Sequence, residues 1–118
     1  MTIVAELLAK PGVIAAGEYT YKADISAYKG PISEHHARML AVMCHATTKA
    51  ATMEGEMLKA LNPRIRIDPA RGWILRGPER TLCVMADVFC VIDNAQASLN
   101  KILGDMSQAL ADEDMDAV

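Results

Sequence analysis

The segment from Ser33 to Leu61 carries more apolar surface than a single helix in a chain of 118 residues needs to bury. Two apolar rows run along it, and at about 100° per residue their centres lie about 130° apart. Together they span an arc of about 200°, whereas a surface helix needs about 100°. The first row, spaced 4, 3, 4, 3 and 4 residues apart, is Met39, Met43, Ala46, Ala50, Met53 and Met57. The second row is Ala37, Leu40, Cys44, Ala51 and Leu58.

One row can cover the chain's own sheet, and the other then needs a different cover, most simply a second copy of the chain. In the alternative arrangement the methionine row faces the sheet and the Leu40 and Cys44 row is partly exposed. An open apolar patch on the order of several hundred Å² is unusual on a soluble monomer. We therefore predict that one row is intermolecular, and the sequence leaves open which one. The expected interface residues on the helix are those of the methionine row.

Composition predicts one folded domain over residues 1–111, followed by an acidic, disordered tail over 112–118. The hydrophobic content of 52% argues against a disordered chain. The net charge is −3, but four acidic residues lie in the tail, and without them 12 basic residues face 11 acidic ones. This balance predicts no binding to nucleic acid or to a membrane surface.

No apolar run approaches the roughly 18 residues of a membrane span, and the N-terminus lacks the basic-then-apolar order of a signal peptide. We therefore expect a cytoplasmic protein. No phosphate-binding loop, dinucleotide-binding turn, nucleophile elbow or paired carboxylate cluster is present in the sequence. The sequence predicts no catalytic residues and no cofactor.

Local patterns predict the order helix, two strands, long helix, three strands, helix, which is an α+β architecture. The predicted helices begin at caps, namely Thr2, Ser33 and Asp93. The predicted strands cover residues 13–19, 24–28, 64–68, 73–76 and 81–92. Asp87 interrupts the last strand and is expected to mark a bulge or an exposed position.

This order of elements resembles the roadblock/LC7 module, a relative of longin and profilin-like folds. Within that group the chain is similar to a bacterial and archaeal family of uncharacterised small proteins, and the resemblance covers roughly residues 2 to 110. The short motifs that carry it are Pro11-Gly12-Val13, Ala15-Ala16-Gly17-Glu18-Tyr19, Tyr28-Lys29-Gly30, Gly72-Trp73 and Ile92-Asp93-Asn94. The hairpin turn at Tyr21-Lys22-Ala23 departs from the Asp-Gly type turn expected of the family.

The resemblance implies a five-stranded antiparallel sheet with the long helix on one face and the terminal helices on the other. It also implies a homodimer in which the strand after the long helix lies at the sheet edge, where two copies pair while their long helices pack together. The edge residues expected in that interface are Arg64, Ile65, Arg66, Ile67 and Asp68. Family members are often associated with heterodisulfide-reductase-like sulfur-oxidation components, which suggests a redox or sulfur-metabolising context.

Three thiols offer a second hypothesis, a sulfur carrier or redox site. Cys44, Cys83 and Cys90 are odd in number and lie in apolar segments without a Cys-X-X-Cys motif. On one regular strand, Cys83 and Cys90 would lie on opposite faces. The alternative is that all three are buried small hydrophobes.

The other polar candidates also have two interpretations. Basic residues around one tryptophan could bind an anionic ligand or partner, or could simply be solvated; they are Arg71, Trp73, Arg76 and Arg80. Glu34, His35 and His36 lack the spacing of a helical metal site and suit the start of a helix, so we predict no metal. An enzyme site formed between subunits by Trp73, Arg76 and the two histidines is a third, weaker hypothesis.

The leading prediction from the sequence is a noncatalytic homodimeric scaffold or regulatory protein. It would bind another, larger cytoplasmic protein, in a redox or sulfur-oxidation system if the resemblance holds. The rival prediction is a small-ligand or sulfur-carrier protein that acts through a cysteine thiol.

Overall fold

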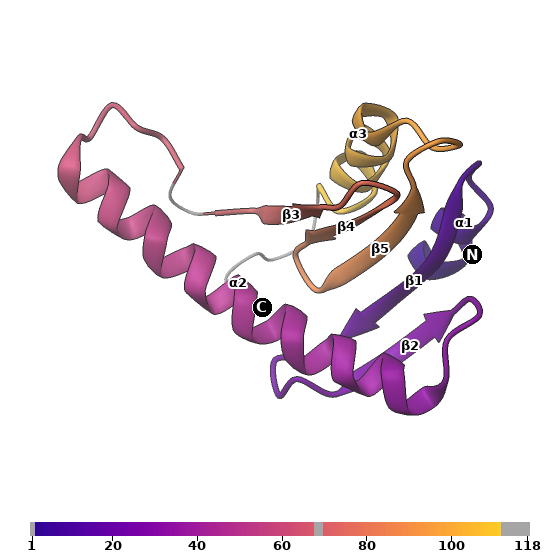
Figure 1. The fold of residues 1–118 in the computed structure, drawn as a ribbon. Coiled ribbons are helices and arrows are strands. Elements are labelled where there is room, and N and C mark those ends of the chain that lie inside the picture. The colour runs from indigo at the N-terminus through magenta and orange to yellow at the C-terminus, as the bar shows by residue number, and fades with distance from the viewer. Residues whose placement is uncertain (1, 68–69, 112–118) are drawn as a thin grey trace.

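The computed structural model describes residues 2–67 and 70–111, and in these ranges the chain forms helices around one five-stranded sheet (Figure 1). The elements follow one another in the predicted order of helices and strands. Their bounds are α1 Ile3–Leu8, β1 Val13–Tyr19, β2 Ile25–Lys29, α2 Glu34–Leu61, β3 Gly72–Arg76, β4 Arg80–Met85, β5 Val88–Asp93 and α3 Leu99–Ala109. The acidic tail predicted over 112–118 and the predicted interface residue Asp68 lie outside the described residues.

The sheet has the strand order β2-β1-β5-β4-β3, and each neighbouring pair is antiparallel. The first strand after the long helix, β3, therefore lies at one edge, as the resemblance implied. At the other edge, β2 follows β1 through a turn in which Ala23 has a φ of 66°. The hairpin turn expected at Tyr21-Lys22-Ala23 is confirmed, because the Ala23 N–H donates to the Thr20 carbonyl at 2.9 Å.

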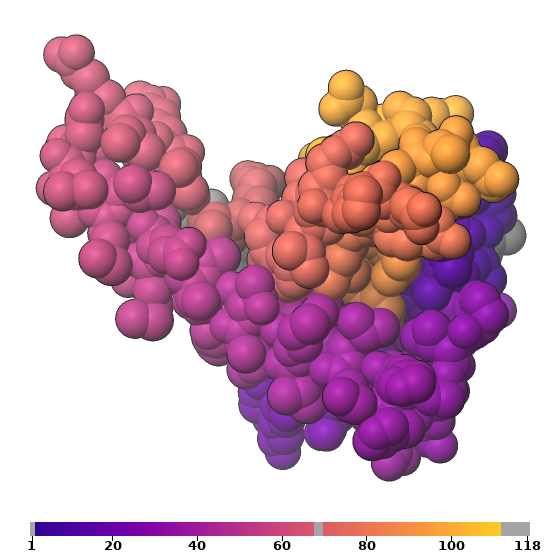
Figure 2. Space-filling view, viewed as in Figure 1, coloured from indigo at the N-terminus to yellow at the C-terminus, as the bar shows by residue number. Residues whose placement is uncertain are grey.

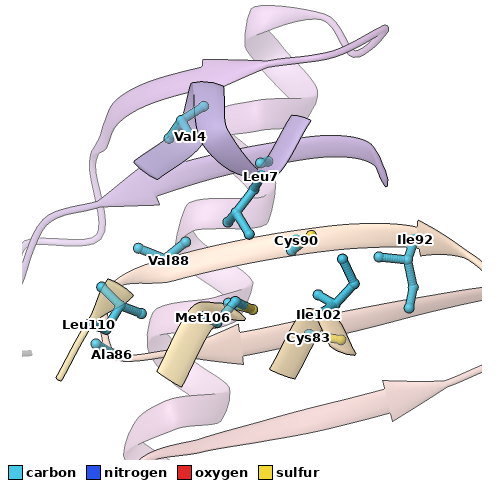
Figure 3. Packing of buried hydrophobic residues seen from close by; sticks show 11 residues of the cluster. Val4, Leu7, Cys83, Ala86, Val88, Cys90, Ile92, Ile102, Met106 and Leu110 are labelled. Carbon is cyan, nitrogen blue, oxygen red and sulfur yellow. The ribbon is translucent and has the colours of Figure 1, made fainter. Parts of the chain in front are cut away.

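The two faces of the sheet have separate cores. On one face, α1 and α3 pack Val4, Leu7, Ile102 and Met106 against strand residues such as Val88 (Figure 3). On the other face α2 covers a second cluster, whose buried members are Tyr19, Ala41, Cys44, Leu82, Val84 and Phe89. The predicted α+β sandwich, with the long helix alone on one face, is confirmed.

Side-chain oxygens cap the helices. The Thr2 hydroxyl accepts from the Ala5 N–H at 3.2 Å, and the Ser33 hydroxyl accepts from the His36 N–H at 3.1 Å. Both predicted caps are thus confirmed. The long helix ends at Leu61, just before Asn62-Pro63, as the sequence indicated.

The predicted cap of the last helix is wrong. The Asp93 carboxylate accepts from the Ala95 N–H at 2.9 Å in a turn that follows β5. The helix begins later, where the Ser98 hydroxyl accepts from the Lys101 N–H at 3.3 Å. Asp93 and Ser98 are both good capping residues, and the sequence pattern did not separate a capped helix from a capped turn.

The long strand predicted over 81–92 is a hairpin. The chain turns at Ala86 and Asp87 between β4 and β5, so Asp87 occupies a tight turn and not a bulge. Ala86 adopts a φ of 54°, a conformation that Gly or Asn would adopt more readily. Because Ala-Asp is a weak turn signal, the two apolar strands were joined in the prediction.

The strand predicted over 64–68 is also wrong for residues 64–67, which form a turn and an irregular segment. The cause is the length of α2, whose 28 residues extend about 42 Å. Its first half lies on the sheet, and its second half extends past the edge at β3, so the chain after Leu61 must travel back to reach β3 (Figures 1 and 2). We call the second half of α2 together with residues 62–67 the arm.

The arm is held together by close packing at one glycine. Gly55 is buried, and a Cβ placed on it would lie 3.4 Å from Cγ2 of Ile67. Residues 62–67, which we call the return segment, therefore lie directly against the helix.

In the described part of the chain, α2 and the two shorter helices all lack the combination of length and apolar character that a bilayer crossing requires.

Candidate functional site

The outward side of α2 is an apolar surface that the described residues leave uncovered. Residues Ala37, Ala41 and Cys44 face the sheet and are fully buried. Met53 and Met57, in contrast, are 63% and 65% exposed, and Met39 is 56% exposed. The methionine row therefore points away from the chain's own sheet, and the row that contains Ala37 and Cys44 faces it. That the methionine row is intermolecular stays a prediction. We call Met39, Met43, Ala46, Ala50, Met53 and Met57 the methionine face; each of these residues is exposed.

The methionine face is symmetric about its own midpoint. Read from either end it has the same residue types at the same spacing, Met-Met-Ala-Ala-Met-Met, and the midpoint is at the level of Thr48. A helix with such a pattern presents the same surface after a half-turn about an axis through that midpoint. This is the property that an isologous, antiparallel contact between two copies requires.

Thr48 itself lies on the inner side of α2 and fixes the helix to the sheet. Its hydroxyl accepts from the Trp73 indole N–H at 2.9 Å and lies 3.2 Å from the Tyr19 hydroxyl. The Tyr19 hydroxyl also donates to the Ala86 carbonyl at 3.2 Å. Burial raises the pKa of Tyr19 to about 12, although its hydrogen bond with Thr48 lowers it. These bonds attach β3 and β1 to the middle of α2, on the side opposite the methionine face.

The edge strand β3 is apolar and unprotected. Ile74 and Leu75 are 44% and 60% exposed, and no charged residue occurs before Arg76 at the end of the strand. A groove of about 290 Å³ runs between this edge and α2, lined by Met43, Thr47, Ala50, Ala51, Glu54, Trp73, Ile74 and Leu75. Proteins usually blunt such an edge with charge, proline or a bulge, or else they pair it.

The end of α2 and the segment that follows it add apolar surface to the arm. Leu61 is 80% exposed and Ile67 is 45% exposed, while Arg64 and Arg66 are exposed beside them. Ile65 is half-buried. The assignment of these residues to a self-association interface stays a prediction. It was based on an edge strand over 64–68, whereas the strand at the edge is β3.

The predicted basic patch is divided by the sheet. Trp73 packs in the core under α2, whereas Arg76, three residues along the strand, projects to the opposite face. Arg80 lies 3.8 Å from the Asp93 carboxylate, and Arg71 precedes β3. The four residues do not converge on one site.

The cysteines are buried in both cores. Cys44, Cys83 and Cys90 each have 0% exposure. Because the hairpin turns between them, Cys83 and Cys90 are direct partners across β4 and β5 and lie on the same face, contrary to the prediction of opposite faces. Burial raises the pKa of Cys44 and Cys90 to about 12, and it raises the pKa of Cys83 despite the opposing effect of the Arg76 guanidinium.

The histidines lie at two separate places on α2. His35 and His36 are exposed at the start of α2 with ring centroids 5.8 Å apart. His45 packs its ring edge on Tyr19, at a centroid distance of 6.4 Å. Within residues 2–67 and 70–111, no group of three or more His, Cys, Asp or Glu side chains is placed to hold a metal ion.

Sequence reasoning missed the contributions of Thr48, Ile74 and Leu75. The hydroxyl of Thr48 binds residues 25 and 29 positions away, so no local pattern reveals it. Ile74 and Leu75 were expected in a short strand, but their position at the open edge depends on the turn at Ala86, which was not predicted.

Comparison with known proteins identifies the family. A model for a family described as "Uncharacterized conserved protein (DUF2173)" matches residues 3–108. The chain belongs to this family. No curated protein matched the sequence.

Solved structures share the fold of this DUF2173 protein. The gliding protein MglB from Thermus thermophilus is 18% identical, with a TM-score of 0.71, 90% of this chain and 78% of that chain being covered. An MglB described as having a tetrameric arrangement gives 18% identity, a TM-score of 0.72 and the same coverage. A Roadblock/LC7 domain from Streptomyces avermitilis is 9% identical with a TM-score of 0.64, covering 92% of this chain and 91% of that one. The roadblock/LC7 fold is thereby confirmed.

The thiols of this DUF2173 protein are expected to be unreactive while the chain is folded. Since thiolate is the reactive form, a pKa near 12 should slow alkylation of Cys44 and Cys90 at pH 8 by roughly two to three orders of magnitude relative to the urea-unfolded chain. Iodoacetamide labelling followed by mass spectrometry of each cysteine peptide measures this. A cysteine that alkylates equally fast with and without urea would contradict the assignment as inert core residues.

Proposed function

We propose that the protein is a homodimeric, noncatalytic scaffold or regulatory module that acts by binding another, larger protein. The observation that carries the homodimer is the methionine face, which is exposed on one copy and symmetric about its midpoint. The MglB described as tetrameric has the same fold and self-associates by its own title, which supports the proposal without fixing the interface used here.

The symmetry of the face specifies one antiparallel register. Met39 of one copy lies opposite Met57 of the other, Met43 lies opposite Met53, and Ala46 lies opposite Ala50. The small alanines at the centre permit a close approach of the two helices, to about 8–10 Å between axes. Towards both ends the methionine side chains fill the space that opens as the helices diverge.

The edge strands can use the same two-fold axis as the helices. The bond from the Trp73 indole to Thr48 attaches the first half of β3 to α2 at the helix position that is also the midpoint of the methionine face. In the proposed dimer the two-fold axis that pairs the helices also brings the two β3 edges together. Pairing through β3 would satisfy backbone groups of an otherwise open edge and would cover Ile74 and Leu75.

The thiol-carrier alternative has little support. A carrier thiol must reach solvent or a partner and ionise readily, whereas Cys44, Cys83 and Cys90 have 0% exposure and raised pKa values. The subunit-interface enzyme has no converging set of groups in the described residues, because Arg76 lies on the other face of the sheet from Trp73. Binding of a partner protein remains the function that the surface favours.

The partner is proposed to be a cytoplasmic protein, and the family resemblance suggests a redox or sulfur-oxidising system as its context. Affinity capture from the native host tests whether such a partner binds. The wild-type chain is one bait, and a Met43→Glu variant, whose surface is unchanged outside the methionine face, is the matched second bait. We expect a larger protein to be retained by the wild-type chain and to be depleted with the variant. Retention of the same proteins by both baits would argue that pairing is not needed for the partner.

The register is tested by introducing opposite charges at two positions that face each other across the predicted contact. Met43→Glu or Met53→Lys alone should raise the dissociation constant of the dimer about 100-fold or more, because each places two unpaired charges in an apolar contact. The double variant Met43→Glu/Met53→Lys should regain pairing, since the introduced carboxylate lies opposite the introduced ammonium of the other copy. Sedimentation velocity over a dilution series measures the dissociation constants.

The control carries the same two charges out of register. In Met39→Glu/Met53→Lys the new groups lie about one helical turn apart across the contact, because position 39 faces position 57. This variant should stay dissociated under conditions in which the matched pair associates. Equal behaviour of the two double variants would refute the register.

A further inference from the structure

The exposed methionines of the described chain are gathered on the methionine face. Met39, Met43, Met53 and Met57 are 56%, 39%, 63% and 65% exposed. The other described methionines lie in or against the core on the far side of the sheet, and Met106 has 0% exposure. Leucine would supply similar apolar area with a better-defined shape, so the use of methionine at all four positions adds a chemical property that pairing alone does not require.

We infer that the methionine face is an oxidation site, at which peroxide-class oxidants convert these thioethers to sulfoxides in the separated chain and thereby oppose pairing. The inference rests on the proposed homodimer. Oxidation of the methionine face would make self-association sensitive to oxidants, because the same surface forms the proposed contact.

The chemistry is a two-electron oxygen transfer. Hydrogen peroxide gives one oxygen to the thioether sulfur: the S–O bond forms, the O–O bond breaks, the sulfur loses two electrons, and the peroxide leaves as water. The cysteines do not compete effectively, because they are buried and their thiolates are scarce at neutral pH. The four exposed methionines are then the sulfur-containing side chains of the described chain that peroxide reaches most readily, ahead of the half-buried Met85.

Oxidation opposes pairing because it converts an apolar side chain into a polar one. In the predicted register Met43 meets Met53 of the other copy, and neither thioether can donate a hydrogen bond to a sulfoxide oxygen. A buried sulfoxide would therefore lose its bonds to water without replacement. The two-fold axis doubles the effect, since oxidation at one position in each chain places two sulfoxides in the contact.

The accessibility of the sulfur atoms also couples oxidation to the concentration of the protein. The separated chain exposes all four thioethers, whereas pairing would cover them. Dilution should then accelerate oxidation, and oxidation should hold the chains apart. Reduction of the sulfoxides by methionine sulfoxide reductases would restore the paired state.

The test compares the full-length chain before and after hydrogen peroxide. Peptide mass mapping should locate the added oxygen atoms at Met39, Met43, Met53 and Met57, faster at low protein concentration than at high. The dissociation constant should rise about tenfold or more. Treatment with methionine sulfoxide reductases should return it to the starting value.

The matched control is Met39→Leu/Met43→Leu/Met53→Leu/Met57→Leu, which keeps apolar area and helix propensity but has no thioether on the face. This variant should pair before and after peroxide. A chain with mapped sulfoxides at all four positions and an unchanged dissociation constant would overturn the inference and leave the proposed homodimer intact. An untreated chain that remains single would overturn both, and reductase reversal provides a test that is independent of the leucine variant.

Discussion

The contact between the inner side of α2 and the sheet determines what the rest of the molecule presents to its surroundings. Small buried residues, Ala37, Ala41 and Cys44, let the helix lie close to the sheet, and the hydroxyl of Thr48 sets its position through bonds to Tyr19 and Trp73. With that side packed on the sheet, the methionines on the opposite side are left exposed by the part of the chain that the structure describes. The apolar side chains of α2 that the sheet does not bury are therefore exposed on one side of the helix.

Two further open surfaces follow from the same contact. Because α2 is longer than the sheet is wide, its second half leaves the body as the arm and carries Leu61 and Ile67 with it. Because the chain returns from the arm into the sheet at β3, that strand takes the edge, and no other strand of the described residues pairs with its outer side. A second copy related by an axis at the level of Thr48 would cover the helix face and the edge together, so the proposed self-association would follow directly from the fold.

Local sequence patterns predicted the parts of this structure that local forces decide. The caps at Thr2 and Ser33, the bounds of α2 and the first hairpin all depend on residues within a few positions of each other. The hairpin at Ala86 was missed because an alanine with positive φ is held by the surrounding strands and not by its own preference. The segment after Leu61 alternates as a strand does, yet whether it pairs depends on where the long helix delivers it. The outward orientation of the methionine face likewise needed the structure, since both sides of the helix are apolar in sequence.

Sedimentation equilibrium of the full-length, reduced protein tests the central claim most directly, because it weighs the particle without labels or substitutions. If the methionine face is covered by a second copy, the mass should approach twice the 12.8 kDa of one chain as concentration rises and should fall towards 12.8 kDa on dilution. A mass of 12.8 kDa maintained across the whole range, including high concentration, would mean that the face stays in water and would contradict the account.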